Sequence, residues 1–202
     1  MTINTRRTIG QMYSRSGQIT VAQYLTVVPW VFTVTPHNYL YYPQVRDVIQ
    51  SIDNADRQLP QTITFSSNNL SWFTAYKGEL SLAQAAALTL ASVPAANATT
   101  ISIGNVPAGS AATVVFAAGD FIQIGAYVYK VTAQVLRTST TVSVTIHRPI
   151  IGTPSTGTLT AVGSNCYWSV IATDCPTYTL TPMTGGAFVN WNNPFSFREY
   201  IT

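Results

Sequence analysis

The sequence predicts a mainly β protein: a split β-barrel or sandwich that carries an inserted small β module and one or two short helices. Two observations indicate this class. The polar residues are chiefly Thr, Ser, Asn and Gln, and Thr occurs together with Val, Ile and Tyr in short alternating segments, which is typical of strands. Hydrophobic residues make up 47% of the 202 residues, which is enough for a buried core in one domain with an insertion.

Charged residues are unusually scarce in this chain. They make up 8% of the sequence, against about 25% in an average globular protein. Charges normally keep the surface of a monomer solvated and its copies apart, so their scarcity suggests that partners cover much of the surface. The net charge of +3 is too small to predict specific nucleic-acid binding. We also expect no membrane partner, because the sequence shows neither an export signal nor a long apolar run.

Residues 1–18 are predicted to form an N-terminal arm, because they are polar and basic and two glycines interrupt any periodicity. The main β-barrel is expected to comprise residues 19–80 and 160–202. Its first strands are predicted at 19–28 and 30–34, separated by Pro29, which cannot donate a ladder hydrogen bond.

Residues 43–60 change period and predict a helix bracketed by two prolines. Their apolar side chains recur at steps of three and four residues, at Val45, Val48, Ile49, Ile52, Ala55 and Leu59. The following residues 62–76 alternate again around Asn68–Asn69 and predict a hairpin. A second short helix is predicted at 81–92, where Ser81 and Gln84 have the spacing of a capping box. Its apolar sequence predicts burial in the fold or against a neighbouring subunit.

An inserted β module is predicted over residues 81–159, because five short strands separated by turn residues follow one another within 98–148. The chain then returns to the main barrel. Strands are predicted there at 166–173, 177–181, 187–191 and 195–201. The last of them alternates clearly between apolar and polar residues, so we expect it to lie in the main sheet.

Chemistry-bearing residues are few and scattered. The chain has seven carboxylates, two histidines, two cysteines and two lysines, and no recognisable catalytic or phosphate-binding motif. Asp120 follows a glycine at the start of a strand and is expected to accept hydrogen bonds from nearby backbone N–H groups. His37 and His147 have no second ligand at metal-binding spacing, and Cys166 and Cys175 could be two buried thiols or a disulfide. We therefore expect no catalytic residue, no cofactor and no metal, and hence no enzyme.

The aromatic residues allow an alternative in which they stack on sugar rings. The residues concerned are Trp30, Trp72, Trp168, Trp191, Tyr39, Tyr41, Tyr42 and Tyr167. The competing interpretation, which we favour, is that they fill the core or contacts between subunits.

Residues 116–150 resemble a segment of tail and baseplate proteins of tailed bacteriophages. The segment opens with Gly119 and Asp120, continues through an aromatic-rich strand at Tyr129, and ends in Arg148–Pro149. The ending WNNPFSFREYI likewise resembles the closing strand of distal-tail and tail-tube-like proteins. Together these segments cover about a quarter of the chain.

The resemblance implies a split β-barrel that closes into a ring, commonly of six subunits, at the end of a phage tail. On this hypothesis the chain is a non-enzymatic virion protein, assembled in the cytoplasm of the host bacterium, that joins the tail tube to other tail and baseplate proteins. The alternatives are a head-to-tail connector, a capsid cement protein or a carbohydrate-binding adhesin. The residues expected at the assembly interface are Arg6, Arg7, Arg15, Arg46, Arg57, Phe195, Phe197 and Arg198.

Overall fold

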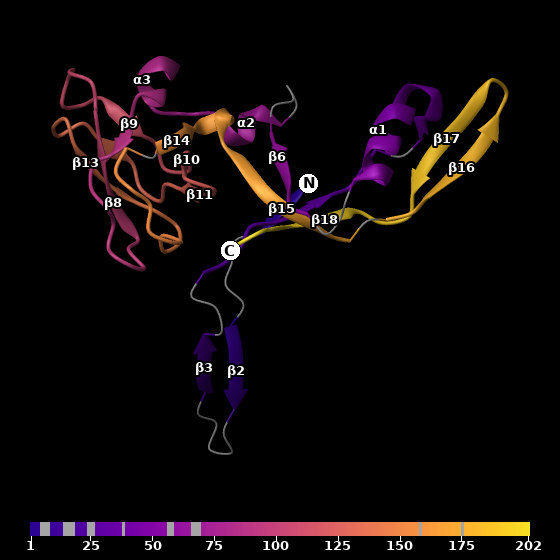
Figure 1. The fold of residues 1–202 in the computed structure, drawn as a ribbon, viewed down its shortest axis with the longest axis horizontal. Helices are drawn as coiled ribbons and strands as arrows, with labels where there is room; N and C mark the ends of the chain where they lie inside the picture. The colour runs from indigo at the N-terminus through magenta and orange to yellow at the C-terminus, as the bar shows by residue number, and fades with distance from the viewer. Residues whose placement is uncertain are drawn as a thin grey trace. The chain divides into compact units, whose positions relative to one another are not determined.

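The computed structural model describes residues 1–4, 9–13, 19–23, 27–37, 39–55, 59–65, 70–157, 159–174 and 176–202. The protein is mainly β, as the sequence predicts, and its described strands form small antiparallel sheets without a closed barrel (Figure 1). The chain divides into two compact units. The first comprises residues 1–22, 28–61 and 169–202, and the second comprises 23–27 and 62–168. The sequence placed these boundaries near 80 and 160 instead.

The first unit contains a sheet that brings together strands far apart in the sequence. This sheet has five described strands in the order β1 (Thr2–Asn4), β4 (Val31–Val34), β18 (Phe195–Glu199), β15 (Tyr167–Asp174) and β6 (Gln61–Thr64). Residues 167–168 of β15 and 62–64 of β6 are assigned to the second unit. The predicted final strand is therefore confirmed, and it lies between two partners. Part of the predicted arm also joins this sheet, because β1 pairs with β4. Two further strands, β2 (Ile9–Tyr13) and β3 (Ile19–Gln23), pair with each other.

The alternation predicted in the final strand is also confirmed. Phe195 and Glu199 are buried, whereas Arg198 between them is exposed. The buried Glu199 carboxylate accepts a hydrogen bond from the Trp30 backbone N–H at 3.0 Å, and the Glu199 backbone N–H donates to the Trp30 carbonyl at 2.8 Å. These two bonds fasten the end of β18 to the residue before β4 and satisfy a charge inside the fold.

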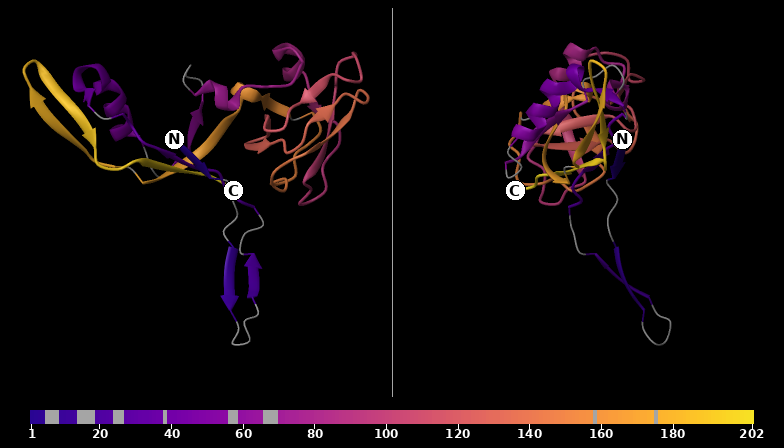
Figure 2. Two further views of the ribbon diagram at one scale, coloured as in Figure 1. Left: turned by 180° about the vertical axis from the view of Figure 1, so that it is seen from behind. Right: turned by 90° about the vertical axis from the view of Figure 1, so that its right-hand side faces the viewer.

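A second small sheet of the first unit lies against a helix. We call it the hairpin sheet, and its order is β16 (Tyr178–Met183), β17 (Gly186–Trp191) and β5 (Leu40–Tyr41). Helix α1 (Tyr42–Asn54) packs against β17, and both views of the ribbon show them side by side (Figures 1 and 2). The predicted helix at 43–60 is thus present but ends earlier, at an extended Ala55.

The second unit contains three small sheets around one hydrophobic core. The sheets are β11-β10-β14 (Tyr127–Lys130, Phe121–Ile124, Leu159–Val162), β12-β9 (Val135–Leu136, Val114–Phe116) and β13-β8-β7 (Val142–Thr145, Thr100–Gly104, Thr89–Leu90). The core unites buried residues of all three sheets, among them Ile103, Phe116, Ile122 and Val144. Strands are therefore present throughout 98–148 as predicted, but there are six of them, β8 to β13, where the sequence predicts five.

Two sequence predictions for the second unit are wrong. The expected hairpin at 62–76 is instead a strand, β6 (Gln61–Thr64), followed by a helical turn, α2 (Ser71–Thr74); Asn68–Asn69 lies outside the described residues. Phe73 of α2 packs on Phe65 and Phe121, so tertiary aromatic contacts stabilise the turn.

The second predicted helix is shorter than expected. Helix α3 (Leu82–Ala86) has the predicted capping box, in which the Ser81 hydroxyl accepts from the Gln84 backbone N–H at 3.2 Å. The helix stops because the following residues form β7, which pairs Leu90 with Ile103. Of its residues only Ala85 is buried within the chain, and Leu82 is 69% exposed, so the fold itself does not bury the helix all round. A short 3₁₀ turn, η1 (Gly163–Asn165), leads into β15.

Candidate functional site

The hairpin sheet is the part of the described structure that offers the clearest interaction surface. Its strand β16 is an edge strand, and among the described strands only β17 pairs with it. Thr179 to Met183 are all exposed although they alternate between the two faces of the sheet. Leu180 is 42% exposed and Met183 is 45% exposed. This strand therefore presents both faces and one edge to its surroundings.

The direction of the backbone groups in β16 follows from the pairing. Thr177 lies opposite Asn192, whose N–H donates to the Thr177 carbonyl at 3.1 Å. In an antiparallel pair the N–H and C=O of alternate residues point to the same side. Thr179 and Thr181 therefore also face β17, whereas Tyr178, Leu180 and Pro182 direct their backbone groups outward. Pro182 lacks an N–H, so the outer edge offers the N–H groups of Tyr178 and Leu180 only.

One face of the hairpin sheet carries an aromatic cluster. Phe188 of β17 lies opposite Tyr41 of β5, and their ring centroids are 6.4 Å apart. Tyr39 meets the Phe188 ring edge to face at 6.3 Å and is 69% exposed. Beside them, the Asn190 side chain accepts from the Tyr39 backbone N–H at 3.3 Å and donates to the Thr181 hydroxyl at 3.5 Å. One exposed ring, Tyr39, and two partly buried rings thus lie next to amide and hydroxyl groups.

Two glycines, Gly185 in the turn after β16 and Gly186 at the start of β17, make room for this cluster. Gly185 has φ +86°, a conformation that glycine adopts without strain. The Tyr41 hydroxyl donates to the Gly185 carbonyl at 2.8 Å. A Cβ on Gly186 would lie 2.6 Å from Cε2 of the Tyr41 ring, so the ring can occupy this position only because the residue is glycine.

The opposite face of the hairpin sheet belongs to the fold. Val189 is fully buried there, and the Tyr178 hydroxyl donates to the Asp53 carboxylate of α1 at 3.4 Å. Trp191, on the same face, packs on both Tyr178 and Phe195. The helix therefore covers this face along β17, while the outer strand extends beyond it.

The hairpin sheet is also free of charge over a long stretch. No charged residue occurs between Asp174 and Arg198, a segment that contains all of β16 and β17. Proteins usually protect exposed edge strands with charged residues, prolines or bulges. In β16 the only protection of this kind is Pro182.

Most titratable groups with shifted pKa values lie within the second unit and are engaged by the fold. Burial, with the charges of Arg148 and Lys130, lowers the pKa of His147 to about 3, and its Nδ1 accepts from the Lys130 backbone N–H at 3.0 Å. Burial raises the pKa of the free thiol of Cys166 to about 12, which makes it unreactive. The other predicted thiol, Cys175, lies outside the described residues.

Asp120 binds backbone groups, as the sequence predicts. Its carboxylate accepts from the Ala117 N–H at 2.8 Å and from the Lys77 N–H at 2.9 Å. Burial raises the pKa of this carboxyl, while the same hydrogen bonds oppose the rise. Next to it, the Tyr76 hydroxyl donates to the Val115 carbonyl, and burial raises the pKa of Tyr76 to about 12. These groups hold residues 76–80 against β9.

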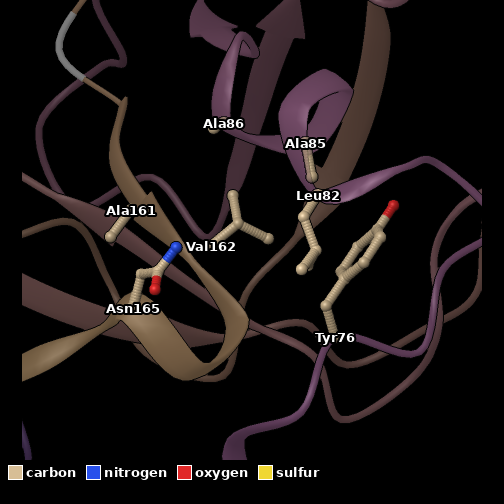
Figure 3. A pocket seen from close by; sticks show the side chains of 7 residues that line it. All are labelled: Tyr76, Leu82, Ala85, Ala86, Ala161, Val162 and Asn165. Carbon is tan, nitrogen blue, oxygen red and sulfur yellow. The ribbon is translucent and has the colours of Figure 1, made fainter.

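A small pocket in the second unit is lined by residues of α3, β14 and η1 and by Tyr76 (Figure 3). Its volume is about 60 Å³. Pockets that bind small-molecule ligands are typically about 300–1,000 Å³. This pocket is therefore too small for an organic substrate. Among the described residues, no group of three or more His, Cys, Asp or Glu side chains is placed to hold a metal ion.

The structure describes half of the predicted interface residues, and it places three of these, Phe195, Phe197 and Arg198, on β18. Arg6, Arg7, Arg15 and Arg57 lie outside the described residues. Arg46 on α1 and Arg198 on β18 are exposed. Phe197 is partly buried, and Phe195 is only 7% exposed and packs on Trp191, so it belongs mainly to the core of its own unit.

The aromatic residues separate into core and surface. Trp30 and Trp168 are buried, as the favoured interpretation expects, whereas Trp72 is 67% exposed. Tyr39 and Tyr41 were among the residues considered for sugar binding. Phe188, which joins them, was not, because only the pairing of β17 with β5 places it there.

No helix in the described part of the chain is both long and apolar enough to cross a membrane. A scan against known protein families finds no matching family, and a search of curated proteins finds no similar sequence.

Proposed function

We propose that this chain is a non-enzymatic structural subunit that works by packing against copies of itself and against neighbouring proteins in a larger assembly. The observation that carries the proposal is the hairpin sheet, whose outer strand exposes Leu180 and Met183 within a segment free of charge. A surface of this kind has little electrostatic repulsion to prevent association. The low overall charge of 8% extends the same argument to the whole chain.

In its specific form, the proposal is a ring-forming virion subunit at the end of a bacteriophage tail, which joins the tube to distal components. Its support is the resemblance of residues 116–150 and of the closing strand to tail and baseplate proteins. The ring would consist of six copies and leave a central lumen. A head-to-tail connector or a cement protein would use the same surfaces in another part of the particle.

Native mass spectrometry and negative-stain electron microscopy of the purified full chain test the proposal. We expect a closed assembly, with six-membered rings as the specific form. Assemblies of another closed stoichiometry would support the structural role but contradict the six-membered ring. A chain that stays monomeric at every accessible concentration, without partner proteins and with folded circular dichroism, would contradict self-association.

Carbohydrate binding is a second candidate function, favoured by the aromatic cluster with its exposed Tyr39. Tyr39 and Phe188 present rings beside the polar side chains of Asn190 and Thr181, and aromatic rings next to hydroxyl and amide groups can bind sugars. A glycan array with the intact chain tests this function. Binding should be lost in Tyr39→Ala and kept in Trp72→Ala, which removes an equally exposed ring from the other unit. Equal loss in both variants, or no binding by the wild type, would reject it.

A further inference from the structure

We propose that β16 pairs with β16 of a second copy of this chain, antiparallel and about a two-fold axis, with Leu180 opposite Leu180 of the second copy. This inference deepens the proposed assembly function by naming one of its contacts. It would join two hairpin sheets into a continuous six-stranded sheet. A two-fold contact of this kind uses the same surface on both copies.

The first argument is that the edge is open and bears no charge. Thr179, Leu180 and Thr181 are exposed, and no described strand pairs with their outer side. Strand β16 itself carries no charge, so pairing two copies of it brings no charged residues of the strand together. The Asp53 carboxylate, which accepts from the Tyr178 hydroxyl, belongs to α1 on one face of the sheet. A charged partner strand would find no opposite charge in β16 to pair with, whereas a second copy of β16 is itself uncharged and can pair without leaving a charge unpaired.

The second argument is that Pro182 and the bounds of the strand together favour one register. Only Tyr178, Leu180 and Pro182 direct backbone groups outward, so these residues must oppose one another. With Leu180 opposite Leu180, Tyr178 opposes Pro182, and about four hydrogen bonds form: two between the leucines and one from each Tyr178 N–H to a Pro182 carbonyl. Because Pro182 has no N–H, each Tyr178–Pro182 pair lacks only the hydrogen bond that would run from residue 182 to the Tyr178 carbonyl.

Other registers are poorer. Centring the pair on Thr181 places Pro182 opposite Leu180 and leaves about two hydrogen bonds within the strand. Centring it on Thr179 gives the same number of hydrogen bonds, all between Tyr178 and Leu180, but places residues 181–183 opposite residues that precede the strand, so only residues 178–180 pair within it.

The side chains also match themselves in the proposed register. The Leu180 side chains meet on one face, where Tyr178 lies beside Pro182 of the second copy. On the other face Thr179 lies beside Thr181 of the second copy. Apolar pairs and Thr–Thr pairs are both favourable across antiparallel strands. A two-fold axis perpendicular to the joined sheet keeps equivalent faces of the two copies on the same side. Both aromatic clusters would therefore lie on one side of the sheet and both α1 helices on the other.

Disulfide crosslinking of three single-cysteine variants tests the register directly. Leu180→Cys, Thr179→Cys and Thr181→Cys are made in a Cys175→Ser background, and the buried Cys166 is kept because it is unreactive. All three positions are exposed, so the variants should fold. Paired residues in antiparallel strands have Cα atoms about 4.5–5.5 Å apart, within disulfide reach, whereas residues offset along the strands are farther apart. We expect Leu180→Cys to form dimers at least about tenfold faster than the other two.

Each other result contradicts the proposed contact. Faster linking at Thr179→Cys or Thr181→Cys would show another register, and no linking at any position would show that β16 does not pair with itself. If the wild type still assembles in that case, the structural role stands and only this contact is wrong. If the wild type is monomeric as well, both proposals fail.

A second variant removes the contact while sparing the hairpin. Leu180→Pro deletes an outward N–H, so pairing with β17 is kept, and the dissociation constant of the assembly should rise by about tenfold. Thr179→Pro is the control for fold damage, because it deletes an N–H that faces β17. Unchanged assembly of a folded Leu180→Pro variant would overturn the proposal.

Discussion

Strands β10 and β16 are both uncharged but differ in how far they are buried. All four residues of β10, Phe121–Ile124, are buried, because β11 and β14 pair on either side and the core covers the strand. In β16 only Tyr178 is partly buried, and the remaining residues are exposed. Both strands are free of charge. The comparison shows that uncharged strands occur in two settings in this chain. In the second unit such a strand is buried in the core, whereas in the hairpin sheet it leaves an uncharged surface and edge open to a partner.

The largest expected effect contrasts two tryptophans. Trp168 is fully buried and packs edge to face on Phe65 and Phe121, with ring centroids 5.1 and 5.9 Å away. Trp168→Ala should lower the free energy of unfolding by about 3–5 kcal/mol, because it leaves a cavity. Trp72→Ala, at an exposed position, should change it by no more than about 0.5 kcal/mol. Urea unfolding followed by circular dichroism measures both. Similar losses in the two variants would mean that the core is not where we place it.

Acid should weaken the second unit through His147. Its pKa is about 3 in the folded protein, against an ordinary value of 6.5. Between these values the unfolded chain binds a proton that the folded chain does not, so stability is complete above pH 6.5 and is lost as the pH falls toward 3. We expect a loss of about 2–3 kcal/mol from this residue between pH 7 and 4. His147→Asn, which cannot titrate, should lose correspondingly less stability over that range. Parallel pH profiles would refute this role.

Asp120 provides an intermediate effect in the same unit. Its two carboxylate oxygens accept from Ala117 and Lys77. In Asp120→Asn the amide nitrogen replaces one acceptor and leaves one buried N–H without its partner, which should cost about 1–3 kcal/mol at pH 7. Thermal unfolding of Asp120→Asn against wild type measures this. A variant as stable as wild type would show that the carboxylate is dispensable for holding residues 76–80.

The smallest effect concerns the hairpin sheet. Gly186→Ala should displace the Tyr41 ring and break its hydrogen bond to Gly185, at a cost of about 1 kcal/mol, because the ring can move toward solvent. Gly109→Ala is the control, since its new Cβ would meet no atom closer than 3.7 Å. Tyrosine resonances in NMR spectra, together with unfolding curves, report both changes. Unperturbed Tyr41 resonances in Gly186→Ala would contradict the packing described here.

Sequence patterns predicted best those elements whose causes are local. The capping box at Ser81 and Gln84 formed as predicted because both groups belong to one turn. The alternating strands near the C-terminus also formed, since their two faces have different surroundings. The failures have distant causes. Helix α3 ends early because Leu90 pairs with Ile103, and α2 replaces a strand because Phe73 packs on Phe121.

The candidate site was predictable in part. Tyr39 and Tyr41 stood out as aromatic residues close together in the sequence. Their association with Phe188 depends on a pairing between strands about 147 residues apart, which no local pattern reveals. The exposure of β16 could not be predicted from the sequence either, because a strand of Thr, Leu and Met has the pattern of a half-buried strand and only its neighbours in the fold show that it is exposed.

The place of β18 between β4 and β15 has a consequence for the order of folding during synthesis. β18 supplies both neighbours with hydrogen bonds, yet the ribosome makes it after every strand with which it pairs. Residues 62–168 are nearly the whole of the second unit and are available much earlier. Because domains generally fold as their residues emerge, we expect the second unit to fold first, while β4 keeps one edge unpaired until residues 195–199 leave the exit tunnel. Chaperones that bind nascent chains would therefore bind the first unit mainly during that interval.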